Sequence, residues 1–249
     1  MIAVLGALAP APLAGCQAAG EDVDGAFYDG DGRAVHCALG LDTVTRNSLA
    51  SIDTALDRAA ARGEVVELYA HDPGRTVEIE TLAHVLDGAT ARGLPFVTYA
   101  AFARGEGAGR GLALSFDDTS IRSWYALRPL LQQHAARVTF FVSRYHKVDA
   151  ERRALLHELA ADGHDIEAHS VLHLRAPEYV EDFGLAAYLE DEVRPSIEIL
   201  RADGFEISAF AYPFGARTGE LDRALLAEVP ILRSVSFSFA GVIASPCPR

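Results

Sequence analysis

Positive charge is scarce in this sequence of 249 residues, in which 22 Lys and Arg stand against 35 Asp and Glu and the formal net charge is −13. An acidic surface repels phosphates, so nucleic acid is not an expected partner. It also disfavours docking on anionic lipid by charge alone. No internal repeat or low-complexity tract stands out. Half of the residues are hydrophobic, so the chain can bury a sizeable core and is not expected to be disordered.

Long apolar runs are also lacking after the start of the chain, so the sequence predicts no membrane span there. The start itself is different, because residues 1–16 are small and apolar up to Cys16 and polar residues follow. This pattern is typical of an export signal, and the ending LAGC resembles a bacterial lipobox. We therefore expect residues 1–16 to be a lipoprotein-type signal and Cys16 to carry a lipid that anchors the protein to a membrane. No Lys or Arg precedes the apolar run, so ordinary signal cleavage and a misplaced start codon are the alternatives.

Cysteine is rare as well, with three in the chain. If Cys16 carries lipid, Cys37 and Cys247 remain, near the two ends of the folded part. Export implies an oxidising compartment, so we predict a Cys37–Cys247 disulfide, with two unrelated thiols as the alternative. The residue after Cys16 is Gln17, which by resemblance to known lipoproteins indicates the outer membrane or the cell surface. We expect an exported, lipid-anchored protein of the cell envelope.

Strand-like and helix-like segments alternate along most of the chain. Residues 17–34 are rich in Gly and Asp and predict a tether that leads into a domain at 35–249. Expected strands are 35–41, 64–70, 95–100, 112–116, 137–143, 164–169, 206–213 and 231–239, and expected helices are 47–63, within 76–93, 120–134, 149–163, 184–202 and 217–228. Alternation favours the α/β class with parallel strands. We predict a (β/α) barrel, a distorted or incomplete relative of the TIM type with seven to eight parallel strands, whose first and last strands adjoin. A doubly wound open sheet is the alternative.

Two groups of polar residues follow expected strands. The stretch LSFDD ends in Asp117 and Asp118, and His169 and His173 come just after the strand 164–169. Active sites of parallel barrels lie at the carboxyl ends of the strands. Adjacent residues of an extended chain point opposite ways, so one Asp can bind a cation while the other acts as a base. One carboxylate and two imidazoles fit a catalytic Zn²⁺ or Co²⁺ site with open positions. Taken singly, each pair is more often a solvated loop, a helix cap or a chance spacing.

Two further features are weaker. The segment AFAYPFGAR places Tyr212 and Pro213 at a strand end, where backbone N–H groups can point at an oxyanion, although Pro213 can equally be a simple strand terminator. His71 follows the strand 64–70 and is a candidate general acid. A lone His in that place is more often a surface or capping residue.

These stretches resemble the motifs of a known family. LSFDD, HSVLH and YPFG are similar to motifs one, two and three of the polysaccharide deacetylases, carbohydrate esterase family 4 with the NodB homology domain. LYAHDPG is similar to their last motif. The resemblance implies that Asp117 is the base and that Tyr212 gives a backbone N–H to the oxyanion. It also implies that His71 is the acid, and that the metal ligands are Asp118, His169 and His173.

The sequence departs from the family pattern in three ways. His71 precedes motif one instead of following motif three, which we interpret as a circular permutation; a closed barrel tolerates this because its ends meet. The usual motif-three Arg is absent, and Ala211 and Tyr212 stand in its neighbourhood. The Asp/Trp motif has no clear counterpart, although Asp42 is a stand-in.

We therefore expect a metal-dependent hydrolase that removes acetyl groups from an N- or O-acetylated envelope or extracellular polysaccharide. The missing Arg keeps open a non-catalytic glycan- or metal-binding lipoprotein with the same barrel, and a hydrolase of small amides is a third hypothesis. Trp124 and Tyr125 follow the Asp pair and could stack on a sugar ring, but aromatic residues on a helix usually belong to the core.

Overall fold

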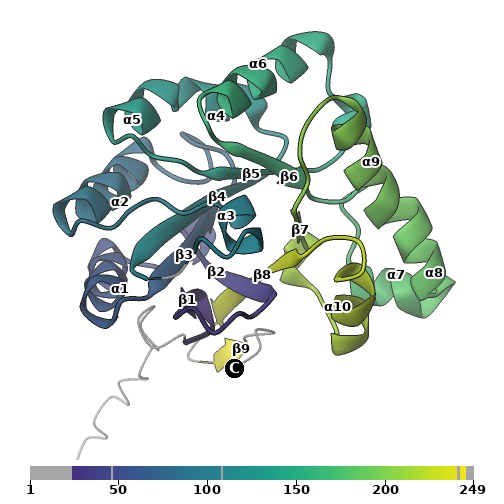
Figure 1. The fold of residues 1–249 in the computed structure, drawn as a ribbon, viewed down its shortest axis with the longest axis horizontal. Helices are drawn as coiled ribbons and strands as arrows, with labels where there is room; N and C mark the ends of the chain where they lie inside the picture. The colour runs from purple at the N-terminus through teal and green to yellow at the C-terminus, as the bar shows by residue number, and fades with distance from the viewer. Residues whose placement is uncertain (1–23, 46, 108, 240–241, 245–249) are drawn as a thin grey trace, which may run out of the picture.

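A ring of seven parallel strands forms the centre of the molecule in this computed structural model (Figure 1), which describes residues 24–45, 47–107, 109–239 and 242–244. The strands are β2 (Val35–Gly40), β3 (Val65–Ala70), β4 (Gly111–Asp118), β5 (Thr139–Val142), β6 (Asp165–Ala168), β7 (Ala209–Ala211) and β8 (Ile231–Phe239). Their spatial order is β3-β2-β8-β7-β6-β5-β4, and β4 pairs with β3 to close the ring. The predicted (β/α) barrel is confirmed, with seven strands, and the open sheet is excluded.

The first and last strands of the barrel adjoin, as predicted. Strand β2 pairs with β8 along 35–39 and 232–236, and both lie at the same side of the barrel in Figure 1. The barrel is distorted, because β6 and β7 share a single residue pair and β2 and β3 share two. Cys37 is buried in β2. Cys247 and residues 1–23 lie outside the described residues, so the disulfide, the signal and the anchor at Cys16 stay predictions.

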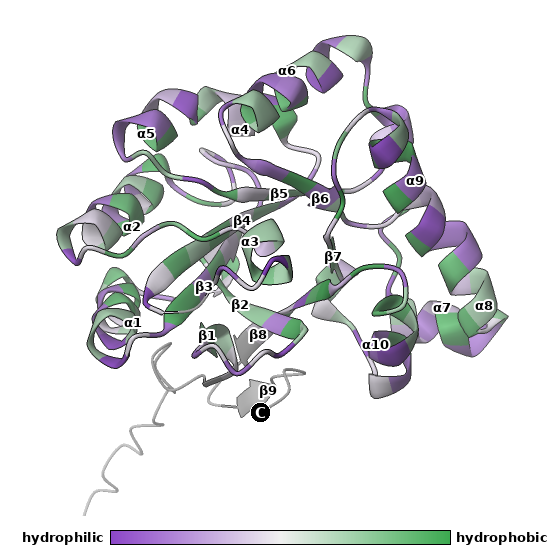
Figure 2. Ribbon diagram, in the orientation of Figure 1, coloured by the Kyte–Doolittle hydropathy of each residue, from purple (hydrophilic) through white to green (hydrophobic). Residues whose placement is uncertain are grey.

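Helices surround the barrel and connect its strands. They are α1 (Leu49–Arg62), α2 (Ile79–Ala91), α4 (Ile121–Ala126), α5 (Arg128–Gln133), α6 (Ala150–Ala161), α7 (Ala176–Phe183), α8 (Leu185–Tyr188), α9 (Arg194–Ala202) and α10 (Gly219–Leu225). Their turns alternate between hydrophilic and hydrophobic residues (Figure 2), as expected when one face packs on the barrel and the other meets water. None of the helices within the described ranges combines the length and the apolar character that crossing a bilayer requires.

Helix α1 illustrates how the sequence sets these elements. The Ser48 hydroxyl accepts a hydrogen bond from the Ser51 N–H at its start, and Gly63 ends it with φ 72°. Its buried side chains are Ile52, Ala55, Leu56 and Ala59, which lie on one face because of their spacing. Full burial of a leucine such as Leu56 contributes roughly 1.5–3 kcal/mol to stability.

The strand expected at 95–100 is wrong. Strands β3 and β4 pair directly over six residues, so no strand fits between them. The segment makes one isolated bridge, between Phe96 and Leu112, and then forms the short helix α3 (Tyr99–Ala103), capped by Thr98. The backbone N–H of Tyr99 donates to Thr139 at the start of β5, at 3.1 Å, and its hydroxyl donates to Glu67, at 2.8 Å. Helix α3 therefore closes the amino-terminal end of the barrel, opposite the expected site.

Part of the expected tether belongs to the folded domain. The 3-10 turn η2 (Asp24–Ala26) leads into β1 (Phe27–Tyr28), which pairs antiparallel with β3. The Phe27 ring is buried, with the guanidinium carbon of Arg58 3.7 Å from its centre. Apolar Phe27 and Tyr28 therefore anchor this segment although Gly and Asp dominate its composition. At the other end, β9 (Val242–Ala244) pairs antiparallel with β8.

Alternation along the strands separates two apolar regions. One lies between the strands and the helices and includes Leu114 and Phe116 of β4. The other lies inside the barrel and includes Ala113 of the same strand, Phe141 and Ala211. Continuing this alternation to the end of β4 turns one of the two adjacent Asp residues inward, toward the barrel axis.

Candidate functional site

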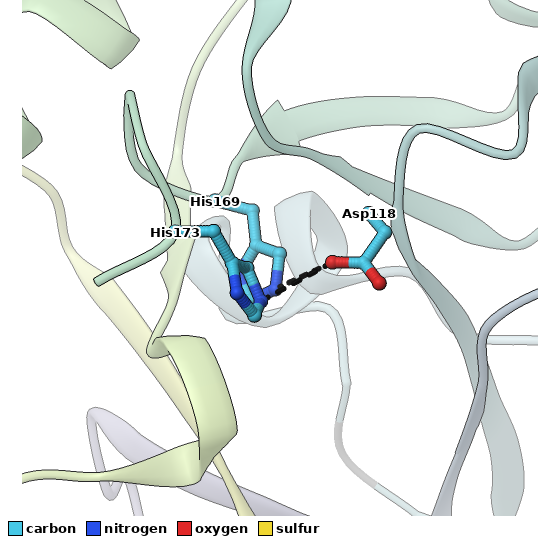
Figure 3. Close-up of side chains that lie close together, drawn as sticks. All are labelled: Asp118, His169 and His173. Carbon is cyan, nitrogen blue, oxygen red and sulfur yellow. Dashed lines mark ion pairs between the residues drawn. The ribbon is translucent and has the colours of Figure 1, made fainter. Parts of the chain in front are cut away.

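Three predicted metal ligands converge at the carboxyl ends of β4 and β6. Asp118 ends β4, His169 follows β6, and His173 lies in the loop after it. Their side chains meet in Figure 3. The Asp118 Oδ1 atom is 3.2 Å from Nε2 of His173 and 3.8 Å from Nε2 of His169. Among the described residues, these three form the only group of His, Cys, Asp or Glu whose ligand atoms lie mutually close enough, within 4.8 Å, to hold a metal ion.

Strained backbone supports this convergence. Asp118, Ser170, His173 and Phe214 have φ values of 82°, 67°, 63° and 58°, which is a left-handed region that non-glycine residues seldom adopt. Each such residue costs on the order of 1–3 kcal/mol, and such residues concentrate at functional sites. Phe214 joins the group because its ring centre is 4.7 Å from that of His173. The strain is thus concentrated around the three ligands.

The protonation pattern of His169 leaves a ligand atom facing Asp118. Nδ1 of His169 is 2.8 Å from the carbonyl oxygen of Ala211, so it carries the proton and donates it. Nε2 then presents a lone pair. Burial, assisted by the positive charge that His173 would carry, holds the pKa of His169 well below its ordinary value, and burial also lowers the pKa of His173. Both imidazoles are therefore expected to be neutral.

The donor set fits a divalent cation. Oδ1 of Asp118 is buried and makes no hydrogen bond within the described part of the chain. A buried carboxylate oxygen facing imidazole lone pairs is unfavourable unless a cation lies between them. One carboxylate and two imidazoles suit Zn²⁺ or a similar borderline ion. The Ala211 carbonyl orients His169 in the way that outer groups orient metal ligands.

The neighbouring carboxylate, Asp117, points into the barrel and meets a residue that the sequence reasoning missed. Arg233 of β8 donates from Nη2 to Oδ1 of Asp117. Both side chains are buried, at 4% and 0% exposed. Arg233 and Ala211 are register partners on β8 and β7. The arginine expected near Ala211 on β7 is absent, and Arg233 reaches Asp117 from the adjacent strand β8 instead. The side chain of Ala211, beside Arg233, is small.

His71 directly follows β3, the strand next to β4, and is paired with Asp42. Nδ1 of His71 is 2.5 Å from Oδ2 of Asp42, and the Thr76 hydroxyl donates to the other oxygen at 2.6 Å. Burial opposes the imidazolium. The hydrogen bond to Asp42 and the charges of Asp117, Asp42 and Asp118 outweigh it and raise the pKa of His71 to about 9. The side chain is 32% exposed, so His71 is a protonated group that solvent and a substrate can reach.

Two aromatic residues near the site are structural. Trp124 is fully buried, and its Nε1–H donates to the carbonyl of His71 at 2.8 Å. Tyr125 donates its hydroxyl proton to Glu158 of α6 at 2.6 Å. Trp124 is therefore a core residue, as expected of an aromatic residue on a helix, and it also holds the backbone of His71. Tyr125 is held by its contact with α6.

Tyr212, which is expected to give a backbone N–H to the oxyanion, makes hydrogen bonds within the fold. Its backbone N–H donates to the carbonyl of Arg233 at 2.9 Å in the β7–β8 ladder, so that donor is already used. Its side-chain hydroxyl donates to Asp222 at 3.0 Å. In the turn that follows, Gly215 and Ala216 donate their N–H groups to the carbonyls of Tyr212 and Pro213. Pro213 has no N–H, and Phe214, the next residue of the turn, has a left-handed backbone conformation with φ 58°.

Most of the site residues described above lie in a segment that matches a known family model. Residues 104–229 match the model described as polysaccharide deacetylase. The match contains Asp117, Asp118, His169 and His173, whereas His71 and Arg233 lie outside it. No curated protein sequence matches the chain significantly.

Solved structures share the fold. A polysaccharide deacetylase from Bacillus cereus is similar with a TM-score of 0.58 at 17% identity, over 68% of this chain and 57% of that one, so the match spans little more than half of its length. IcaB from Ammonifex degensii is similar with a TM-score of 0.57 at 21% identity, over 74% and 92% of the two chains. The deacetylase PplD of Streptococcus pyogenes, solved with acetate, gives 0.52 at 18% identity, over 66% and 79%.

Proposed function

Because the chain belongs to the polysaccharide deacetylase family, we propose that it is a metal-dependent hydrolase that removes acetyl groups from an N- or O-acetylated envelope or extracellular polysaccharide. One observation carries this proposal: the ligand atoms of Asp118, His169 and His173 face one another beside the carboxylate of Asp117. A Zn²⁺ or Co²⁺ ion held by these three residues would supply a Lewis acid next to a positioned base.

Asp117 is the base in this proposal. It takes the proton of the attacking water, and Arg233 fixes the direction of its carboxylate from inside the barrel. Asp118 faces the imidazoles instead, so the two adjacent carboxylates have separate tasks.

His71 is the acid. It is held by Asp42 and protonated below a pKa of about 9, so it can give a proton to the amine or alcohol that leaves. We assign the oxyanion contact to the backbone N–H of Phe214 rather than to that of Tyr212, because the latter already donates within the sheet. The ring of Phe214 packs against the imidazole of His173, with 4.7 Å between the ring centres, and this contact supports the assignment.

The order of the motifs agrees with a circular permutation. His71 directly follows β3 and precedes Asp117 of β4, and the first and last barrel strands adjoin, so the chain could be opened elsewhere without moving the site. We propose that the segment 35–103 corresponds to the usual end of the family. The non-catalytic alternative relied on the missing motif-three Arg, and the contact between Arg233 and Asp117 weakens it.

Export to the cell envelope, the lipid anchor at Cys16 and the Cys37–Cys247 disulfide remain part of the proposal. They rest on sequence patterns at residues 1–16 and on the cysteine spacing. Mass analysis of the mature protein without reduction measures the lipid anchor and the disulfide, because diacylation and a disulfide each change the mass in a defined way.

Acetate release tests the function. The purified protein is incubated with acetylated chitooligomers, with peptidoglycan and with small amides, and acetate is measured enzymatically. We expect release from a glycan that is lost in Asp117→Asn and on chelation. Metal retention without release from any glycan would favour a binding protein, and release from small amides alone would favour the third hypothesis.

A further inference from the structure

The long helix expected at 184–202 contains a π-helical turn. Between α8 and α9 lies η5 (Leu189–Val193), in which the backbone takes the wider π geometry. Such turns are uncommon and occur frequently at functional sites. η5 carries Glu192, whose side chain is fully buried. Glutamate is seldom fully buried without a partner, so the contacts of this residue are informative.

Glu192 binds the backbone of the loop that carries His173. Its Oε2 atom accepts a hydrogen bond from the Leu172 N–H at 2.9 Å. The second oxygen, Oε1, is buried and accepts no hydrogen bond from the residues that the structure describes. No Lys, Arg or His within those residues forms an ion pair with Glu192. The Leu172 N–H is therefore the polar contact that accounts for a carboxyl group at this buried position.

The loop depends on polar contacts because its own side chain packs little. Leu172 is 44% exposed. Its carbonyl accepts a hydrogen bond from Nη2 of Arg144 at 3.2 Å, and the N–H of His173 donates to Oγ of Ser170 at 3.0 Å. Ser170 and His173 hold left-handed backbone conformations, which a free loop would leave. Glu192 and Arg144 thus hold the peptide groups on both sides of Leu172.

We infer that Glu192 is a positioning residue for the metal site. By holding the Leu172 N–H, it fixes the residue before His173 and with it the distance from the His173 imidazole to Asp118. The inference rests on the proposed function, because it concerns the same three ligands. Glu192 lies 20 residues from Leu172 in the sequence, and its hydrogen bond goes to the loop backbone and not to a ligand side chain. Its effect is on the geometry of the site before an ion binds.

Zinc affinity of metal-stripped protein tests this role. The variants are Glu192→Met, which keeps the volume but has no comparable acceptor, Glu192→Gln, whose amide oxygen can accept the same hydrogen bond, and Ile197→Ala, a matched change at a buried position of α9 away from the loop. Zn²⁺ is titrated against a chelator, and Co²⁺ absorption reports the ligand geometry. We expect Glu192→Met to bind Zn²⁺ roughly 10–100-fold more weakly, as outer-contact changes do, and to change the Co²⁺ spectrum. Glu192→Gln and Ile197→Ala keep the wild-type affinity.

The possible results distinguish a failure of the role inferred for Glu192 from a failure of the proposed metal site. Zinc affinity of Glu192→Met within two-fold of wild type, with a melting temperature lowered as in Ile197→Ala, would overturn the inference and leave the metal site intact. Wild-type protein that binds Zn²⁺ no better than His173→Ala would overturn the proposed metal site instead. If Glu192→Met does not fold, Glu192→Asp carries the test, because its shorter side chain withdraws the acceptor and predicts the same loss of affinity.

Discussion

Arg233 and Asp117 form a buried ion pair across 116 residues of sequence, between β8, the last strand of the barrel, and β4. The register partner of Arg233 on the neighbouring strand is Ala211, in the region where the family resemblance leads one to expect an arginine. The barrel thus supplies a cation to Asp117, the proposed base, from β8 in place of β7.

Removing this cation is expected to impair the base without removing the metal. Arg233→Ala should lower kcat by about 10²-fold or more, since general base catalysis contributes about 10²–10⁴. Bound zinc should stay at the wild-type level. An unpaired buried carboxylate also costs stability, on the order of 3–5 kcal/mol, so melting temperatures must be measured together with kcat.

The double change Ala211→Arg with Arg233→Ala separates catalysis from packing, because it restores the cation from the adjacent strand. Recovery of kcat to within about 10-fold of wild type would support the positional exchange. A stably folded double variant that retains zinc and has no activity above Arg233→Ala would contradict it.

The Asp42–His71 pair predicts a pH dependence. Because the acid works only when protonated, activity should fall as pH rises through the pKa of His71, which is about 9. Asp42→Asn removes the hydrogen-bonded charge that raises this pKa, so the alkaline limb of the kcat profile should move to lower pH. Asp53→Asn is a matched control, since Asp53 pairs with His84 on the surface at 3.1 Å. An unchanged alkaline limb in Asp42→Asn would exclude His71 as the acid.

Metal content should depend on the two ligand imidazoles and not on histidine in general. His169→Ala and His173→Ala should each weaken zinc binding by more than the 10–100-fold typical of outer contacts. His84→Ala, with a half-exposed ring outside the site, should bind zinc like wild type. Equal zinc content in all three variants would place the metal elsewhere.

His164 predicts a loss of stability in acid. Burial, with help from Arg137, lowers its pKa to about 4, and Nδ1 accepts a hydrogen bond from the Val138 N–H at 3.2 Å. The folded protein binds this proton less readily than the unfolded chain, whose pKa is about 6.5. Its contribution, about 3 kcal/mol at 1.36 kcal/mol per pKa unit, is present above pH 6.5 and declines as pH falls to 4. His164→Asn should flatten this slope in chemical denaturation, and an identical slope in both proteins would contradict the assignment.

The local sequence pattern was sufficient to predict the candidate metal ligands. It was not sufficient to predict Arg233 and Glu192, the residues that contact Asp117 and the His173 loop. Asp118 and His169 stand at strand ends, and the carboxyl ends of parallel strands share one face, so the sequence could place them together. Arg233 lies in the apolar run ILRSVSFSF and belongs to no motif. Its contact with Asp117 depends on the way the strands close into a barrel, which brings side chains of β8 and β4 together in the interior. Glu192 was hidden in the same way, because nothing in a helical pattern indicates a π turn.

The pairing of neighbouring strands explains one error, the strand expected at 95–100, and also determines the backbone contact of Tyr212. Residues 95–100 have a strand-like composition, but β3 and β4 pair with each other and leave no place for a strand. Tyr212 follows an apolar strand, but its N–H is part of the β7–β8 ladder and not of the turn beyond it. Strand partners determine both results, and a single sequence does not contain them.

The central claim is that Asp118, His169 and His173 hold one divalent cation beside Asp117. Anomalous diffraction at the zinc absorption edge, from crystals grown with Zn²⁺, tests it most directly. We expect one strong peak bonded to Oδ1 of Asp118 and to Nε2 of both histidines. A map with no peak among these atoms, from a protein that carries zinc elsewhere, would contradict it.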